Sequence, residues 1–181
     1  MNLAFDVTHL VPQDAAMPHR AHPIEQESIR ILRSRVDTSG LSPLVKAVTE
    51  RLVHTTADPT WAAELIADEE SLAAGKRALE AGATIITDTR MVAAGITSRS
   101  PELLDPSSDH AGAVVAIGTD IAACHRDFTG AALVIAFPAG FVGALDAKRA
   151  LVASGVPVLT NRTDRGGFAL ATAAVNALLY A

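Results

Sequence analysis

Four short apolar runs mark the second half of the chain, separated by stretches in which apolar residues recur with helical spacing. The runs are Ala83–Thr87, Ala113–Ile117, Ala131–Phe137 and Val156–Thr160. They are rich in Val, Ile and Ala and have few polar positions. That pattern is typical of strands buried on both faces of a parallel sheet.

Helical spacing also predicts two helices in the first third of the chain. One begins at Pro23, and its mostly apolar stripe includes Ser28. The other opens at Ser42-Pro43, where a capping hydroxyl and a proline in the first turn favour a helix start, and it ends near His54. The stripe residues are Ile24, Ser28, Ile31, Leu32 and Arg35 in the first helix and Leu44, Val48 and Leu52 in the second.

The remaining segments complete an α/β fold. We expect a short and then a longer helix within Pro59–Gly82, a brief helix Thr89–Ala94 capped by Asp88, a short helix ending near Phe128, and helices Ala144–Ser154 and Phe168–Leu179. From Gly82 onward, strands and helices alternate. This order predicts a mostly parallel sheet covered by helices on both faces, a three-layer α/β/α arrangement with right-handed crossovers. A single domain over residues 23–181 and an N-terminal arm over residues 1–22 fit the length.

Composition narrows the class of protein. The net charge of −5 argues against a nucleic-acid binder. The longest apolar run, Ala131–Leu145, is interrupted by proline and glycine and is shorter than the ~20 residues that cross a bilayer, so no membrane association is expected. Cys124 is the single cysteine, which excludes an internal disulfide and favours the cytoplasm. A buried, inert thiol is the simplest interpretation of it. No Cys/His spacing indicates a metal site.

Candidate binding residues follow the strands, where the carboxyl ends of parallel strands form a ligand-binding edge. Arg162 and Arg165 flank a loop that ends in Gly166-Gly167 at a helix start, a setting that suits a carboxylate or phosphate. Solvated surface arginines are the alternative. Arg90 opposes the dipole of its own helix, which predicts an anionic ligand or a nearby Asp as its partner. Gly118-Thr119 lacks the glycine spacing of a nucleotide loop.

His54 is the candidate for proton chemistry, because imidazole titrates near neutral pH and this one lies where a helix gives way to a loop. A favourable partner for the helix dipole is the alternative role. For Ser28 the alternative is a hydroxyl bonded to its own helix. We expect a pocket around His54, with walls from Ser28, Asp88–Met91 and Asn161–Gly167.

Several motifs together resemble the precorrin-8X methylmutase family, called cobalt-precorrin-8 methylmutase in the anaerobic route. They run in order from about Pro23 to Leu179. The matching pieces are Pro23–Leu32, Arg51–His54, Ala81–Ala83, Thr87–Ile96, Ala113–Gly118, Pro138–Ala144 with Lys148, Val156-Pro157, Arg162–Gly167 and Ala173–Leu178.

The resemblance implies an α/β homodimer with sites near the subunit interface. It implies migration of a methyl group from C-11 to C-12 of a precorrin-8-like corrinoid ring, giving hydrogenobyrinate or cobyrinate in cobalamin biosynthesis, with no cofactor and no catalytic metal. It implies that His54 is the active-site histidine and that Ser28 lines the pocket. The other implied substrate-binding residues are Asp88, Arg90, Met91, Gly118, Thr119, Arg162, Arg165, Gly166 and Gly167.

One segment departs from the family pattern. Only Thr97–Gly112 connects the helix around Met91 to the next strand, where the family has a longer insertion. Two alternatives to the methylmutase therefore stay open: a rearrangement enzyme for a smaller, non-corrinoid substrate, and a non-catalytic corrinoid-binding protein.

Overall fold

The computed structural model describes residues 23–181, and the arm predicted for residues 1–22 lies outside this range. The helices are α1 (Pro23–Arg35), α2 (Pro43–Thr56), α3 (Trp61–Glu64), α4 (Glu69–Glu80), α5 (Arg90–Ala94), the 3₁₀ turn η1 (Ala122–His125), α6 (Ala144–Ala153) and α7 (Phe168–Tyr180). The strands are β1 (Leu65–Ile66), β2 (Ile85–Thr87), β3 (Glu102–Leu103), β4 (Val114–Ile117), β5 (Leu133–Ala136) and β6 (Val158–Asn161).

The strands form one sheet in the order β1-β6-β5-β4-β2-β3. All neighbours are parallel except the edge strand β1, which runs antiparallel to β6. The central pair is in register from Val114 with Leu133 to Ile117 with Ala136. The mostly parallel sheet predicted from the apolar runs is therefore confirmed.

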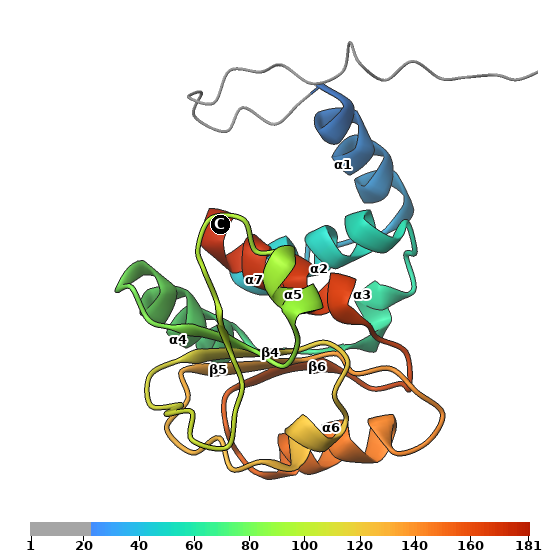
Figure 1. Ribbon diagram of the computed structural model, residues 1–181. Coiled ribbons are helices and arrows are strands. Elements are labelled where there is room, and N and C mark those ends of the chain that lie inside the picture. The colour runs from blue at the N-terminus through green and yellow to red at the C-terminus, as the bar shows by residue number, and fades with distance from the viewer. Residues whose placement is uncertain (1–22) are drawn as a thin grey trace, which may run out of the picture.

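Helices cover both faces of this sheet, as the strand–helix alternation predicts (Figure 1). Every residue of β4 is buried, and successive residues point to opposite faces. Val114 and Ala116 belong to the core beneath α2, α4, α5 and α7, whereas Val115 and Ile117 belong to the core against α6 and η1. The result is a three-layer arrangement with a separate hydrophobic core on each side of the sheet.

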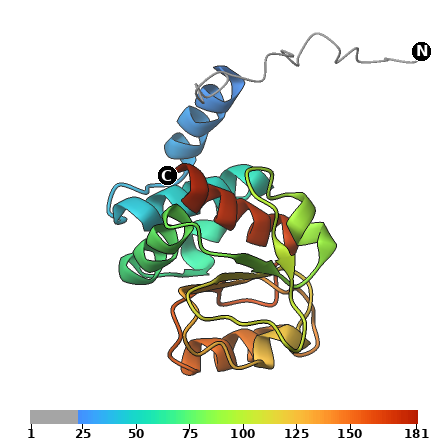
Figure 2. The same ribbon diagram turned by 60° about the vertical axis from the view of Figure 1, so that its left-hand side comes forward.

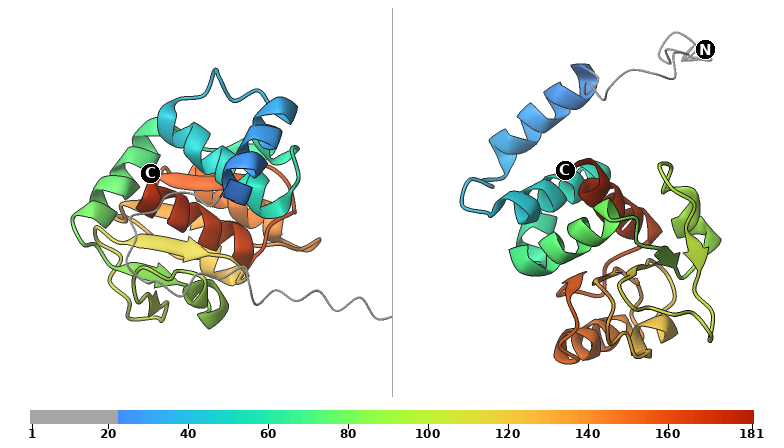
Figure 3. Two further views of the ribbon diagram at one scale, coloured as in Figure 1. Left: turned by 90° about the horizontal axis from the view of Figure 1, so that it is seen from above. Right: turned by 90° about the vertical axis from the view of Figure 1, so that its left-hand side faces the viewer.

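Helix α1 stands apart from the three layers. It projects from the body and packs against α2 rather than against the sheet (Figures 2 and 3). Leu32 is its one buried residue, and Ile24 and Ile31 are exposed. Its position therefore depends on α2, the helix that carries His54.

Two predicted helix caps are wrong, because other side chains occupy their places. Ser42 precedes α2, but its hydroxyl makes no capping bond. Instead the carboxylate of Glu69 accepts hydrogen bonds from the backbone N–H groups of Leu44 and Val45 at 3.0–3.1 Å. Helix α5 is capped by Thr89 rather than by Asp88. A carboxylate from a distant segment suits the positive end of α2 at least as well as a local hydroxyl.

The segment Thr97–Gly112, which connects α5 to β4, contributes the edge strand β3. Arg99 anchors its start by donating to the backbone carbonyls of Ala83, at 3.4 Å, and Leu79. Leu79 is in the last turn of α4, where a cation is favourable, and Ala83 lies just beyond it. The helix predicted to end near Phe128 is only the turn η1.

Candidate functional site

The side chain of His54 is paired with that of Ser28. Ser28 Oγ lies 2.8 Å from His54 Nδ1, and both residues are half-buried. The bond joins α1 to the last turn of α2. When the imidazole is neutral and Ser28 donates, the remaining ring proton is on Nε2. Among the described residues, Nε2 has no hydrogen-bond partner.

A cavity of about 100 Å³ lies beside this pair. Its lining residues are Ser28, Ile31, Leu32 and Arg35 of α1, Val53 and His54 of α2, and Ala57 and Pro59 beyond α2. Ligand pockets usually measure ~300–1,000 Å³, so this cavity admits only the edge of a macrocycle. Neither Asp88–Met91 nor Asn161–Gly167 lines it, which corrects the expectation that those segments form its walls.

The chain beyond His54 leaves α2 through a strained residue. Ala57 has φ of 53° and is the one non-glycine residue with positive φ in the described range. An alanine in this conformation costs roughly 1–2 kcal/mol, because Cβ crowds the backbone. The contacts of the next residue, Asp58, stabilise this exit. Its carboxylate accepts from the backbone N–H and the hydroxyl of Thr60, at 2.9 and 2.7 Å.

Asp58 also forms an ion pair with Arg165, which lies in the loop after β6. A second carboxylate, Glu64, lies 2.8 Å from the same guanidinium, and the aromatic ring of Trp61 lies beneath it at 4.7 Å. The bond to Asp58 is the main reason that the pKa of Arg165 is raised, and the bonds to Thr60 and Arg165 lower the pKa of Asp58. The charge predicted to hold a substrate carboxylate is thus neutralised within the chain.

The backbone of the loop Asn161–Gly167 is held from below by buried donors. Lys148 Nζ donates to the carbonyls of Thr163, at 2.9 Å, and Arg165, at 2.6 Å. The amide of Asn161 donates to the same two carbonyls at 3.3 and 3.0 Å. Burial lowers the pKa of Lys148 to about 8. The sequence contains a signal for this buried lysine, since it shares an apolar stripe with Ala144, Ala147 and Leu151.

The glycines at this edge permit close backbone approaches. A Cβ on Gly166 would collide with the carbonyl of Phe137, and the backbone N–H of Gly167 donates to that carbonyl at 2.6 Å. A Cβ on Gly118 would lie 2.6 Å from Cα of Phe168. These glycines therefore serve chain packing, whether or not they also face a ligand.

Asp88 directly follows β2, and its carboxylate contacts the loop after β4. One of its oxygens accepts from the backbone N–H groups of Thr119 and Asp120, both at 2.7 Å, and from the Thr119 hydroxyl at 3.1 Å. A phosphate loop would offer such N–H groups to its ligand. Here they are already used, which agrees with the missing glycine spacing.

The start of α5 differs, because its charge is left unpaired. Arg90 is exposed, and its side chain makes no hydrogen bond or ion pair with any other described residue, so the predicted Asp partner is not present in this part of the chain. The neighbouring Met91 is 55% exposed. Phe141 and Val142, beyond β5 on the same sheet edge, are 97% and 86% exposed. This edge therefore combines a free cation with exposed apolar side chains.

Comparisons with known proteins give this geometry a family. The family model described as CbiC, precorrin-8X methylmutase, matches residues 23–105 and 102–181. The precorrin-8X methylmutase of Pseudomonas aeruginosa is 32% identical, over 86% of this chain and 93% of that protein. The cobalt-precorrin-8 methylmutase of Methanothermobacter thermautotrophicus is 30% identical, over 88% of this chain and 93% of that protein. The crystal structure of precorrin-8X methylmutase from Thermus thermophilus superimposes with a TM-score of 0.75 at 30% identity, covering 87% and 96% of the two chains.

The chain belongs to the precorrin-8X methylmutase family. The resemblance drawn from the sequence motifs is therefore confirmed, and so is the assignment to the methylmutases, a class of isomerase in cobalamin biosynthesis. The two stretches matched by the family model meet at 102–105, within Thr97–Gly112. This break agrees with the expectation that a longer family segment is shortened there.

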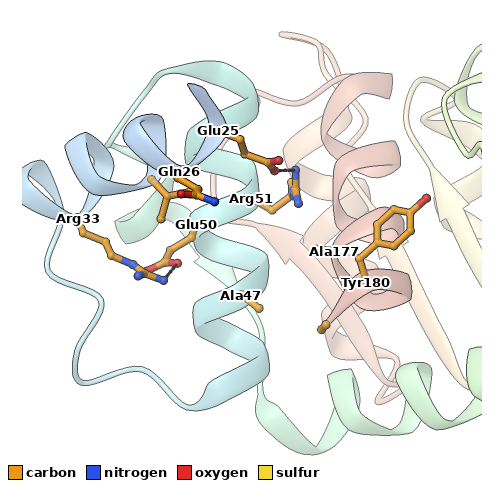
Figure 4. Close-up of a pocket in the computed structure, with 10 residues that line it drawn as sticks. Glu25, Gln26, Arg33, Ala47, Glu50, Arg51, Ala177 and Tyr180 are labelled. Carbon is orange, nitrogen blue, oxygen red and sulfur yellow. Dashed lines mark hydrogen bonds and ion pairs between the residues drawn. The ribbon is translucent and has the colours of Figure 1, made fainter. Parts of the chain in front are cut away.

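This methylmutase has a second, larger hollow between α1, α2 and α7 (Figure 4). Its volume is about 420 Å³. Its charged residues neutralise one another: Arg33 forms a two-bond pair with Glu50 at 2.8–2.9 Å, and Arg51 lies 3.3 Å from Glu25. The hollow therefore offers no free cation from these two arginines for a carboxylated ring, although it is larger than the cavity at His54.

Three further features of the methylmutase concern metal binding, its cysteine and membrane-spanning helices. No group of three or more His, Cys, Asp or Glu side chains in residues 23–181 is arranged to hold a metal ion. Burial raises the pKa of the Cys124 thiol to about 12, so this cysteine is an inert core residue, as its sequence context suggests. Over the same residues, no helix is long and apolar enough to span a bilayer.

Proposed function

We propose that the chain moves a methyl group from C-11 to C-12 of a precorrin-8-type corrinoid, giving hydrogenobyrinate, or cobyrinate when the ring carries cobalt. The main support is the His54–Ser28 pair. In this member of the methylmutase family, Ser28 Oγ lies 2.8 Å from His54 Nδ1, and the imidazole lines a cavity. We assign His54 as the catalytic residue and Ser28 as the residue that orients it.

The proposed chemistry is assistance to an intramolecular rearrangement. As the methyl group migrates, π electrons of the macrocycle are redistributed and charge develops on its framework. His54 donates a proton or a hydrogen bond from Nε2 to a ring atom near the migrating methyl group. Ser28 orients the ring in both states: its hydroxyl donates to Nδ1 of the neutral imidazole, which leaves the ring proton on Nε2 for a hydrogen bond, and it accepts from Nδ1–H of the imidazolium, the form that can give up a proton from Nε2. In this proposal the protein holds the macrocycle in place and supplies one donor group, the His54 imidazole.

Cations bind the carboxylate side chains of the ring in this proposal. Arg90 is the first candidate, because it has no partner among the described residues. Arg35 is another, because it lines the His54 cavity and also lacks such a partner. Arg162 is a third candidate, because among the described residues its guanidinium donates only to the Leu65 carbonyl, at 3.3 Å. Met91, Gly118, Thr119, Gly166 and Gly167 provide apolar and backbone contacts at the same edge.

We also propose that the protein works as a homodimer in the cytoplasm. A cavity of about 100 Å³ cannot enclose a macrocycle, so most of the ring must lie outside it, against another surface. The exposed Phe141 and Val142 supply an apolar surface that a second copy can cover. Light scattering after size-exclusion chromatography tests the dimer, and a monomer at micromolar concentration would contradict it.

The small cavity is the one observation that favours the alternative of a smaller, non-corrinoid substrate. Mixing the purified protein with precorrin-8X separates the possibilities, because the methyl shift changes the conjugation and hence the absorption spectrum. We expect conversion to hydrogenobyrinate. A ring that binds unchanged favours a non-catalytic corrinoid-binding protein, and a ring that does not bind favours a smaller substrate.

A pair of Ser28 variants tests the orienting role. Ser28→Ala removes the partner of Nδ1 and should lower kcat by roughly 10-fold with little change in KM. Ser28→Thr keeps a hydroxyl and should retain most of the rate. Equal rates in Ser28→Ala and the unchanged protein would show that the hydroxyl does not orient His54.

A further inference from the structure

The loop Asn161–Gly167 and the residues that follow His54 form one connected unit. Arg165 links them: its guanidinium binds Asp58, Glu64 and Thr60, the last two at 2.8 Å. Glu64 also accepts a hydrogen bond from the Thr163 hydroxyl at 2.8 Å, so the loop and the segment Asp58–Glu64 are joined at several points.

This unit reaches the wall of the His54 cavity. Ala57 and Pro59, the residues on either side of Asp58, both line that cavity. Ala57 is held in a left-handed conformation that alanine rarely adopts. A contact that fixes Asp58 therefore fixes both the strained exit from α2 and the cavity wall beside the imidazole.

The unit is also anchored to the sheet. Lys148 and Asn161 hold the backbone carbonyl of Arg165 from below, at 2.6 and 3.0 Å. The position of the guanidinium is thus set by buried groups at the end of β6 and on α6. The position of Arg165 is therefore fixed relative to the sheet, and through Asp58 it fixes the end of α2, the helix that carries His54.

We infer that Arg165 is a positioning residue for His54, acting through Asp58, rather than a ligand of a substrate carboxylate. The arginine, Asp58 and Glu64 form a latch that keeps the end of α2 in place against the sheet edge. Two measurements test this inference. The first, turnover, rests on the proposed methylmutase function, whereas the second observes the His54 imidazole directly and does not.

Asp58→Asn separates the two roles of Arg165. A substrate ligand would be released by this change, so ring binding would be unchanged or tighter and turnover would persist. A latch predicts that Asp58→Asn and Arg165→Ala lower kcat by a similar factor, ~10–100-fold, with KM little changed. It also predicts that the double variant is no worse than either single variant.

The signals of the His54 imidazole provide the second arm. In protein labelled with ¹⁵N-histidine, both single variants should weaken the tautomer preference set by Ser28 and move the His54 ring nitrogen signals in the same direction. An influence through charge alone predicts opposite shifts of the His54 pKa, because one variant removes a negative charge and the other a positive one. Opposite shifts would overturn the inference.

Control variants complete the design. Arg149 and Asp146 form an exposed pair on α6 at 3.5 Å, with side chains 69% and 82% exposed. Arg149→Ala and Asp146→Asn should leave turnover and the imidazole signals unchanged. Arg165→Lys keeps the charge without the forked contacts and should give an intermediate rate, and it replaces Arg165→Ala if that variant does not fold.

Additive losses in the double variant, or a rise in KM confined to the Arg165 variants, would contradict the latch. If the unchanged protein has no turnover, the proposed function fails and the imidazole signals alone decide the inference.

Discussion

The start of α5 and the loop Asn161–Gly167 lie at the same edge of the sheet, yet their arginines are in opposite situations. Both segments follow a parallel strand and lead into a helix. Arg165 binds two carboxylates and lies over Trp61, whereas Arg90 has no partner among the described residues. An arginine at a ligand-binding edge is therefore a candidate ligand only when no carboxylate of the chain already neutralises it.

The largest effect on stability should come from the close approach of Gly166 to the Phe137 carbonyl. Gly166→Ala places a methyl group against the Phe137 carbonyl, which cannot move without disturbing β5. We expect a loss of at least ~3 kcal/mol in the free energy of unfolding, or failure to fold. Gly40→Ala is the matched control, because nothing lies within 4 Å of a Cβ at that position and its φ is not in the left-handed region. Urea denaturation measures both variants. A Gly166→Ala protein as stable as the unchanged protein would show that a side chain fits at this position.

Replacing each arginine by alanine tests the contrast in stability directly. Arg165→Ala removes bonds to two carboxylates and should lower the free energy of unfolding by about 1–2 kcal/mol. Arg90→Ala removes no side-chain hydrogen bond or ion pair with another described residue and should change it by less than ~0.5 kcal/mol. Similar losses from the two substitutions would remove the distinction between these regions.

Binding should show the reverse order. Arg90→Ala should weaken the affinity for hydrogenobyrinate by roughly 10-fold, since it removes a free cation from the proposed site. Asp146→Asn, on the opposite layer, serves as a control that leaves affinity unchanged. Titration followed by absorbance measures both. Unchanged affinity in Arg90→Ala would exclude this arginine from the site.

The last effect, which is confined to high pH, concerns the buried amine of Lys148 beneath the loop. The pKa of Lys148 is about 8 in the folded protein and is ordinarily about 10.5 in an unfolded chain. Between these values the unfolded state binds more protons, so this group makes stability rise as pH increases from about 8 to about 10.5. The rise should be about 1–2 kcal/mol relative to Lys148→Met, measured by denaturation at each pH. Parallel pH profiles for the two proteins would contradict it.

The sequence predicted the layers because the central strands are continuous buried runs, a pattern that few other structures produce. It did not predict β1 and β3, since strands of two residues carry no periodicity. The cap on α2 was also missed, because Glu69 is distant in sequence and reaches the helix only through the tertiary fold.

The site was predictable in part for similar reasons. His54 and Ser28 were found by their positions on helices and by the family resemblance, and the fold brings them together at 2.8 Å. The partners of Arg165 were not found, because Asp58 and Glu64 lie more than a hundred residues away from it along the chain. Pairing of charges across such separations is a property of the tertiary structure. Arg35 was seen only as part of an apolar stripe, although it lines the His54 cavity.

The most direct test of the account is the turnover of precorrin-8X by His54→Ala, with ring binding measured on the same sample. We predict that kcat falls by ~100–10,000-fold, the usual loss when a general acid is removed, while hydrogenobyrinate still binds with affinity within a few-fold of the unchanged protein. Turnover within a few-fold of the unchanged protein would contradict the assignment of His54 as the catalytic residue.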